Sequence, residues 1–208
     1  MPRTTFGDSI FVPGDITYSG SLVPGVSRAD IVQQDLQEYA IPFTTMRVHD
    51  NLSALLPATA AADDLGLSGA VFGTESPYLI TADAKATTVT AYGRFQFPLP
   101  VEYTSGQSVR VAIHCGMGTT VSDTSATVDV SAYESDDEGA VGSDLVSTAS
   151  TSCNSLTMSQ VQFVITATAL EAGDVLDCRI KAAITDASTA TGVYVKIGRV
   201  AMLCDIKA

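Results

Sequence analysis

Apolar and polar residues alternate along residues 159–186, and this pattern predicts two strands joined by a turn. Apolar side chains occupy every second position from Val161 to Ala167, and again from Leu176 to Ile180. A period of two places one set of side chains on a buried face and the other towards water. Between the two runs, residues 171–174 (EAGD) supply the Gly and Asp that tight turns need. We therefore expect a half-buried antiparallel pair here.

Most of the chain after Tyr92 repeats this alternation, and the pattern changes phase at Gly198, where we expect a β-bulge or a strand break. Roughly seven or eight strands, separated by turn signals about every 8–12 residues, are typical of a β-sandwich or jelly roll. The sequence thus predicts an all-β, antiparallel β-sandwich. We expect these residues to face each other in its core: Phe95, Phe97, Ile113, Val130, Phe163, Ile165, Leu176 and Ile180.

The first 26 residues combine turn dipeptides with apolar side chains and show no regular period. This mixture favours an extended arm that lies on a partner, although a frayed terminus gives the same pattern. The residues expected to bind that partner are Phe6, Ile10, Phe11, Ile16 and Tyr18. Residues 27–39 predict one short helix, with Ser27 as its N-cap and Pro42 ending it. The expected domains are therefore residues 1–42, the arm and helix, and residues 43–208, the jelly-roll sandwich.

Charge limits the classes of partner. The net charge of −12 argues against nucleic acid, because phosphate contacts need clustered Lys or Arg. No apolar run approaches the length of a membrane span, so we expect no membrane partner either. No Lys or Arg occurs between Arg110 and Arg179, although acidic residues recur there. A solvated acidic rim explains this interval, and a cation site is the alternative.

The cysteines predict free thiols. Cys115, Cys178 and Cys204 share the apolar phase of their strands, whereas Cys153 lies in a polar loop and should be the most accessible. No CxxC spacing occurs, which argues against a zinc site. Small buried thiols of this kind suggest assembly in a reducing cytoplasm.

Catalytic motifs are missing from the sequence: it contains no GxSxG, Walker loop or HExxH. The two imidazoles are His49, beside Asp50, and His114, beside Cys115. Neighbours on a strand point to opposite faces, so His114 and Cys115 cannot form a nucleophile–base pair. We therefore predict no catalytic residues, no cofactor and no enzymatic activity.

Residues 134–139 imitate the first half of a calcium loop, with acidic side chains at Glu134, Asp136 and Glu138. Leu145 occupies the position where the bidentate Glu should stand. An acidic hairpin tip is the better interpretation, with weak Ca²⁺ binding at most, so no metal site is predicted.

The block from Phe95 onward resembles a jelly-roll sandwich that recurs in virion proteins of tailed bacteriophages. The matching pieces are FQFPLPVEYTSGQSVRVAIH, SATVDVSAY, LEAGDVLDCRIKAAITD and VKIGRVAMLCDI. The upstream run RADIVQQDLQEYAIPFTTMRVHDNLSALLP is similar to the lead-in segment of such proteins, so the resemblance covers roughly residues 27–206. It implies a virion protein that is assembled in the host cytoplasm. The favoured role is a capsid decoration (cement) protein that binds the major capsid protein and stabilises the head. A tail or fibre component is the second choice.

The resemblance also implies a symmetric homo-oligomer, with a trimer favoured, whose arm contacts the major capsid protein or another virion protein. A carbohydrate-binding module is the competing class, because jelly rolls also serve as lectins. The absence of Trp weakens it. The side chains that could stack on a sugar are Tyr78, Tyr92, Tyr103, Tyr133 and Tyr194.

Overall fold

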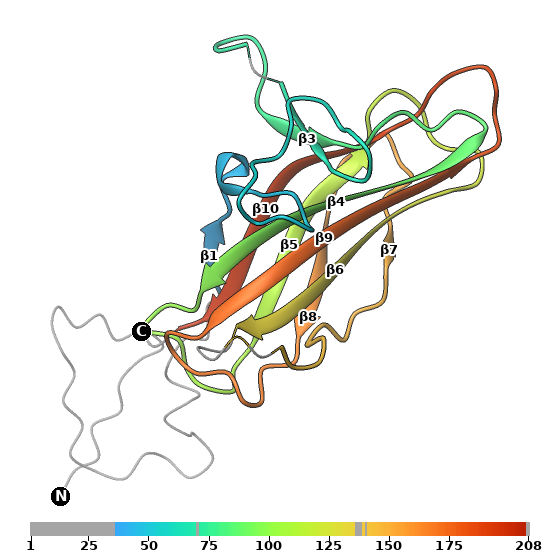
Figure 1. The fold of residues 1–208 in the computed structure, drawn as a ribbon. Coiled ribbons are helices and arrows are strands. Elements are labelled where there is room, and N and C mark those ends of the chain that lie inside the picture. The colour runs from blue at the N-terminus through green and yellow to red at the C-terminus, as the bar shows by residue number, and fades with distance from the viewer. Residues whose placement is uncertain (1–35, 70, 136–138, 140, 207–208) are drawn as a thin grey trace, which may run out of the picture. The chain divides into compact units, whose positions relative to one another are not determined.

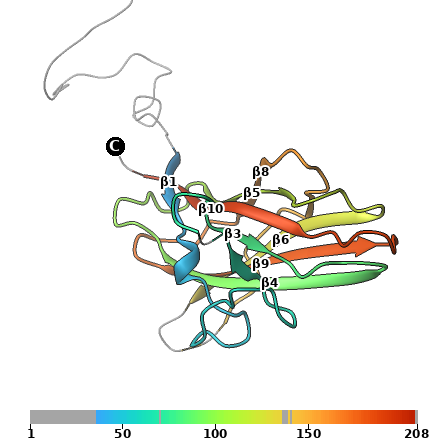
Figure 2. The same cartoon turned by 90° about the horizontal axis from the view of Figure 1, so that it is seen from above.

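Two antiparallel sheets pack face to face in the computed structural model, which describes residues 36–69, 71–135, 139 and 141–206 (Figures 1 and 2). One sheet has the order β2 (Gly66–Ser68), β3 (Tyr78–Ile80), β10 (Val195–Asp205), β5 (Val109–Met117) and β8 (Ser159–Ile165), with β1 (Leu36–Ala40) also paired to β10. The other has the order β4 (Thr87–Pro98), β9 (Val175–Asp186), β6 (Ser125–Ser135) and β7 (Thr151–Ser152). A single 3₁₀ turn, η1 (Phe43–Thr45), is the only helical element of the described residues. The predicted all-β sandwich is confirmed.

The core lies between the two sheets and contains every side chain that the alternation assigned to it. Phe163, Leu176 and Ile180 are fully buried, and Phe97, the most exposed of the eight, is 8% exposed. The phase change at Gly198 is a register shift between Ile197 and Arg199 where β10 pairs with β5, so the bulge is confirmed as well.

The pairing predicted within residues 159–186 is wrong, although both strands exist. β8 pairs with β5 in one sheet, whereas β9 lies between β4 and β6 in the other. The segment between them therefore crosses from one sheet to the other rather than closing a hairpin (Figure 1). Alternation shows that each strand buries one face, but it carries no information about which strand lies alongside.

The helix predicted over residues 27–39 is wrong at its end. Leu36–Ala40 form β1, which pairs with β10 from Leu36 opposite Asp205 to Ala40 opposite Ala201. Leu36 and Tyr39 have helical spacing, but the open edge of β10 offers this backbone a full set of hydrogen bonds, and tertiary pairing overrides the weak helical preference. β1 also lies inside residues 1–42, the segment assigned to the arm and helix.

Several sequence-based expectations fall on residues 1–35, outside the described part of the chain. They are the remainder of the helix and the partner-binding side chains of the arm, Phe6, Ile10, Phe11, Ile16 and Tyr18. Within the described part, no helix has the length and apolar character needed to cross a bilayer.

All four cysteines are free and buried, so the expectation that Cys153 is the accessible thiol is wrong. Cys153 is 4% exposed because its segment folds onto β6, where its N–H donates to the Ala126 carbonyl at 2.9 Å. A hydrogen bond between Cys153 and Cys115 raises the pKa of Cys153 and lowers that of Cys115. Burial raises the pKa of Cys204 to about 12 and also raises that of Cys178. Such thiols behave as small core hydrophobes.

Truncating Phe163 to Ala should lower the free energy of unfolding by about 3–5 kcal/mol, because it leaves a cavity in a core that has no solvent access. Val164 follows it on β8, is 40% exposed, and supplies the matched control. Val164→Ala should cost under about 1 kcal/mol. Urea unfolding monitored by circular dichroism measures both changes, and equal losses for the two variants would contradict the assigned faces.

Candidate functional site

Polar side chains form rows across the outer face of the four-stranded sheet, the face that points away from the core. The strands β4, β9 and β6 are in register, and alternate residues point outward because their neighbours Phe95, Cys178 and Ala132 are buried. The register aligns three rows, Gln96–Asp177–Tyr133, Arg94–Arg179–Ser131 and Tyr92–Lys181–Asp129.

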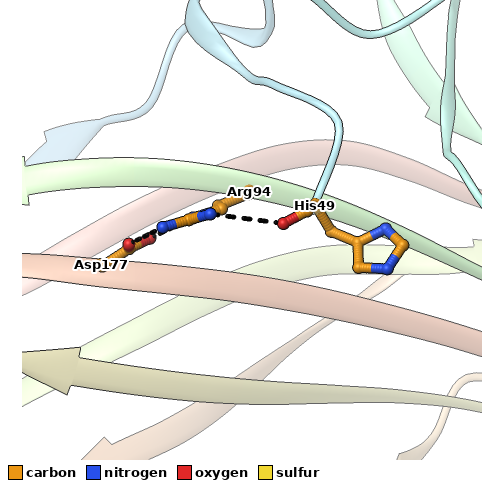
Figure 3. A network of polar contacts seen from close by, with 3 residues as sticks. All are labelled: His49, Arg94 and Asp177. Atoms are coloured by element: carbon orange, nitrogen blue, oxygen red, sulfur yellow. Dashed lines mark hydrogen bonds and ion pairs between the residues drawn. The ribbon is translucent and has the colours of Figure 1, made fainter. Parts of the chain in front are cut away.

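Arg94 and Asp177 form a bidentate ion pair between β4 and β9 (Figure 3). Nε of Arg94 donates to Oδ1 of Asp177 at 2.7 Å, and Nη2 contacts the other carboxylate oxygen. This hydrogen bond raises the pKa of Arg94 above its ordinary value. A fork-to-fork contact of this kind fixes both side chains in one orientation. The carboxylate of Asp177 is therefore held in place on the outer face.

His49 is anchored to the outer edge of β4 by its neighbours and its own backbone. Arg47 exchanges two backbone hydrogen bonds with Arg94, at 2.8 and 2.9 Å, and Nη1 of Arg94 donates to the His49 carbonyl at 3.4 Å. Figure 3 shows the His49 carbonyl facing Arg94 while the imidazole is turned away. The ring lies 4.5 Å from the ring of Tyr92, centroid to centroid, and the Arg179 guanidinium stands 5.1 Å from the same tyrosine ring.

A pocket of about 350 Å³ opens on this outer face, and we call it the outer-face pocket. Its lining comes from β4, β9 and β6, from His49, and from residues that follow β6. The described residues that line it are His49, Arg94, Gln96, Tyr133, Glu134, Ser135, Gly139, Val141, Asp177 and Arg179.

The His49 imidazole lies beside two carboxylates: its Nε2 lies 3.4 Å from Asp63 and its Nδ1 lies 3.5 Å from Asp64. No Ser or Cys of the described residues joins them. His114 is partly exposed while Cys115 is buried, as strand alternation requires. The outer-face pocket thus offers hydrogen-bonding groups and an aromatic ring, and its described residues show no nucleophile–base pair.

The five tyrosines considered for sugar stacking separate into different environments. Tyr92 and Tyr133 lie on the outer face. Tyr103 belongs to the core: it is 1% exposed, donates its hydroxyl to the Gln107 carbonyl, and burial raises its pKa to about 12. Tyr78 lies under the ammonium of Lys196, 3.8 Å from the ring centroid, beside another hollow of about 340 Å³. Tyr194 packs against Gly118, where an added Cβ would come within 2.0 Å of its ring.

Sequence reasoning missed Arg94, Asp177 and Arg179 as site residues. The sequence does indicate that two of them face outward, because Asp177 and Arg179 occupy alternate polar positions of the strand VLDCRIKAAITD. Their convergence with Arg94 depends on the register of β4 against β9, which no local pattern contains.

Comparison with known proteins gives no family. No protein-family model and no curated protein matches the chain. Among solved structures, similar ones include the CBM22-1 xylan-binding domain of Paenibacillus barcinonensis Xyn10C, with 11% identity, a TM-score of 0.43, and coverage of 84% of this chain and 96% of that one. The xylan-binding module CBM15 has 14% identity and a TM-score of 0.41, with 83% and 99% covered. The enzymatically active domain of bacteriophage CBA120 tailspike protein 4 has 11% identity and a TM-score of 0.35, with 69% and 18% covered. Likenesses this distant carry no functional argument.

The Arg94–Asp177 pair should show a measurable coupling energy. In a double-mutant cycle with Arg94→Ala and Asp177→Ala, we expect roughly 1 kcal/mol of coupling in the free energy of unfolding, because the contact is bidentate and partly buried. The Glu38–Arg199 pair between β1 and β10 is the control, since its side chains are 35% and 57% exposed against 18% and 30% for Asp177 and Arg94. A coupling no larger than that of the control pair would show that the pair does not fix the outer face.

Proposed function

We propose that this chain is a non-catalytic binding module that holds a carbohydrate in the outer-face pocket. The observation that carries the proposal is the row Gln96–Asp177–Tyr133, in which an amide, a carboxylate and a tyrosine from three adjacent strands line the same pocket. Binding sites generally combine a concave surface of this size with a few convergent polar groups.

The chemistry of the lining suits a sugar. Pairs of hydroxyls can bridge the carboxylate of Asp177 and the amide of Gln96, and the apolar face of a sugar ring can pack on Tyr133. Because Arg94 already holds Asp177 in position, less side-chain entropy is lost when a ligand binds.

Charge balance in the pocket favours a neutral ligand. Its described lining pairs the cations Arg94 and Arg179 with the anions Glu134 and Asp177. A phosphate-rich ligand would require an excess of positive charge, and the chain as a whole carries −12. A neutral oligosaccharide meets no such requirement.

A glycan array probed with the full chain should give binding to a defined set of oligosaccharides, and Tyr133→Ala should weaken it by about tenfold or more, since a stacking ring is lost. Isothermal titration calorimetry with the best soluble oligosaccharide of the array measures the loss. Tyr78→Ala, on the other sheet, is the control and should bind as the unaltered chain does. Unchanged affinity in Tyr133→Ala, or an array without hits, would contradict the proposal.

A role on a phage particle is the second candidate, and it rests on the sequence resemblance described above. In this proposal the module is a virion protein, a head decoration protein or a tail or fibre component. It would assemble as a homo-oligomer, with a trimer favoured, and residues 1–26 would bind the major capsid protein or another virion protein. Within the described part of the chain, the core runs from Ile41 to Cys204, so these residues already form a core between the two sheets.

Deleting residues 1–26 should leave a folded sandwich that no longer decorates particles lacking the protein. Ordering an apolar arm costs about 1–2 kcal/mol of backbone entropy per residue, so such an arm orders only on a partner that covers it. Cosedimentation with particles measures decoration, and circular dichroism with light scattering checks fold and oligomeric state. Full decoration by the truncated chain would place the anchor elsewhere.

A further inference from the structure

Two buried polar atoms next to the outer-face pocket lack hydrogen-bond partners: Nδ1 of His49 and Oδ1 of Asp64. They lie 3.5 Å apart, on side chains that are 17% and 19% exposed. Leaving a buried donor or acceptor unsatisfied is destabilising. Two such atoms that converge on one another therefore point to a ligand shared between them.

A third ligand lies close by, because a carboxylate oxygen of Asp50, an imidazole nitrogen of His49 and a carboxylate oxygen of Asp64 all lie within 4.8 Å of one another. Zinc binds imidazole nitrogen and carboxylate oxygen at about 2.0–2.2 Å, so two tetrahedral ligands of one ion stand roughly 3.4 Å apart. The separation of 3.5 Å between His49 and Asp64 matches this geometry without rearrangement.

The other imidazole nitrogen has the partner that a metal-binding histidine needs. Nε2 of His49 lies 3.4 Å from Oδ2 of Asp63. A carboxylate beside Nε2 favours the tautomer that carries the proton on Nε2, which leaves the lone pair of Nδ1 free for the ion. Asp63 is therefore a positioning residue, while Asp64 and Asp50 offer ligand oxygens.

Backbone pairing holds these side chains on the edge of β4. Tyr92 donates its N–H to the Asp63 carbonyl at 2.7 Å and accepts a hydrogen bond from the N–H of Leu65 at 2.8 Å. The N–H of Asp64 donates to the Ala61 carbonyl at 2.9 Å, and the His49 ring rests on Tyr92. The cluster is thus preorganised by a strand rather than by a free loop.

We propose that His49, Asp50 and Asp64 bind one divalent transition-metal ion of the zinc type. A mixed nitrogen and oxygen ligand set favours such ions over Ca²⁺, which takes oxygen ligands alone. Three protein ligands leave at least one coordination position for water or a bound molecule. The sequence predicted no metal site, because these ligands come from two separate segments and match no metal-binding spacing. The inference does not depend on carbohydrate binding.

Titrating the full, EDTA-treated chain with ZnCl₂ should give saturable one-to-one binding by calorimetry and a higher melting temperature. Co²⁺ should produce the visible absorption of a nitrogen- and oxygen-ligated ion. His49→Ala and Asp64→Asn should weaken zinc binding at least tenfold, and Asp63→Asn should weaken it about 10–100-fold, as loss of an outer-shell carboxylate does. His114→Ala, which changes the other histidine of the chain, is the control and should bind zinc normally.

Circular dichroism of each variant establishes that it is folded, and Asp50→Asn, at an exposed position, provides a ligand change with little risk to folding. Saturable zinc binding that His49→Ala or Asp64→Asn weakens, in a folded protein, supports the proposal. The proposal is overturned if the native chain shows no saturable zinc binding, if folded His49→Ala binds as well as the native chain, or if Ca²⁺ binds and zinc does not. In the first case the contacts of His49 with Asp63 and Asp64 serve the packing of the β4 edge alone.

Discussion

The alternation of β9 is the constraint on which both the core and the candidate site depend. Over its 12 residues, buried and partly exposed positions alternate without interruption, and both edges are paired, to β4 and to β6. Leu176 and Ile180 face the core, while Asp177 and Arg179 face outward. A slip of one residue would exchange the two sets, bringing charges into the core, so the packing energy of the core also fixes the register of the polar rows. The outer-face pocket is in this sense a consequence of the hydrophobic core.

The edge of β4 is the second structural constraint. An unpaired strand edge can pair with another chain, and proteins commonly cover it. Here two short segments do so, through isolated pairings of Arg47 with Arg94 and of Asp64 with Tyr92. Covering the edge also brings His49, Asp63 and Asp64 to one place on the sheet. The backbone need for hydrogen bonds thus assembles a cluster of side chains that are remote from one another in sequence.

The sequence predicts what depends on a single strand and misses what depends on a partner strand. The buried phase of Phe163 and Leu176 and the bulge at Gly198 follow from local alternation, and all are confirmed. Pairing between strands does not follow from it: β8 and β9 are neighbours in sequence but lie in different sheets. β1 forms because the edge of β10 is open there, although the apolar residues of this segment have the spacing of a helix. Cys153 is also buried by pairing with another strand: its segment packs on β6, although the residues around it in the sequence are polar.

Two residues link the two ligand proposals: His49, which lines the outer-face pocket and is a proposed metal ligand, and Arg94. Nε and Nη2 of Arg94 hold the carboxylate of Asp177 in the outer-face pocket, and its Nη1 reaches the carbonyl of His49 at the proposed metal-binding cluster. Its backbone also pairs with Arg47, which fixes the segment that carries His49. Coupling between two sites requires a physical element that both of them bias, and spatial proximity is not enough. Arg94 contacts residues of both sites, so it is the side chain at which coupling between them can be tested. The Tyr133 and Asp64 side chains each belong to only one of the two sites, so their effects separate carbohydrate binding from metal binding, whereas the loss of Arg94 would disturb both.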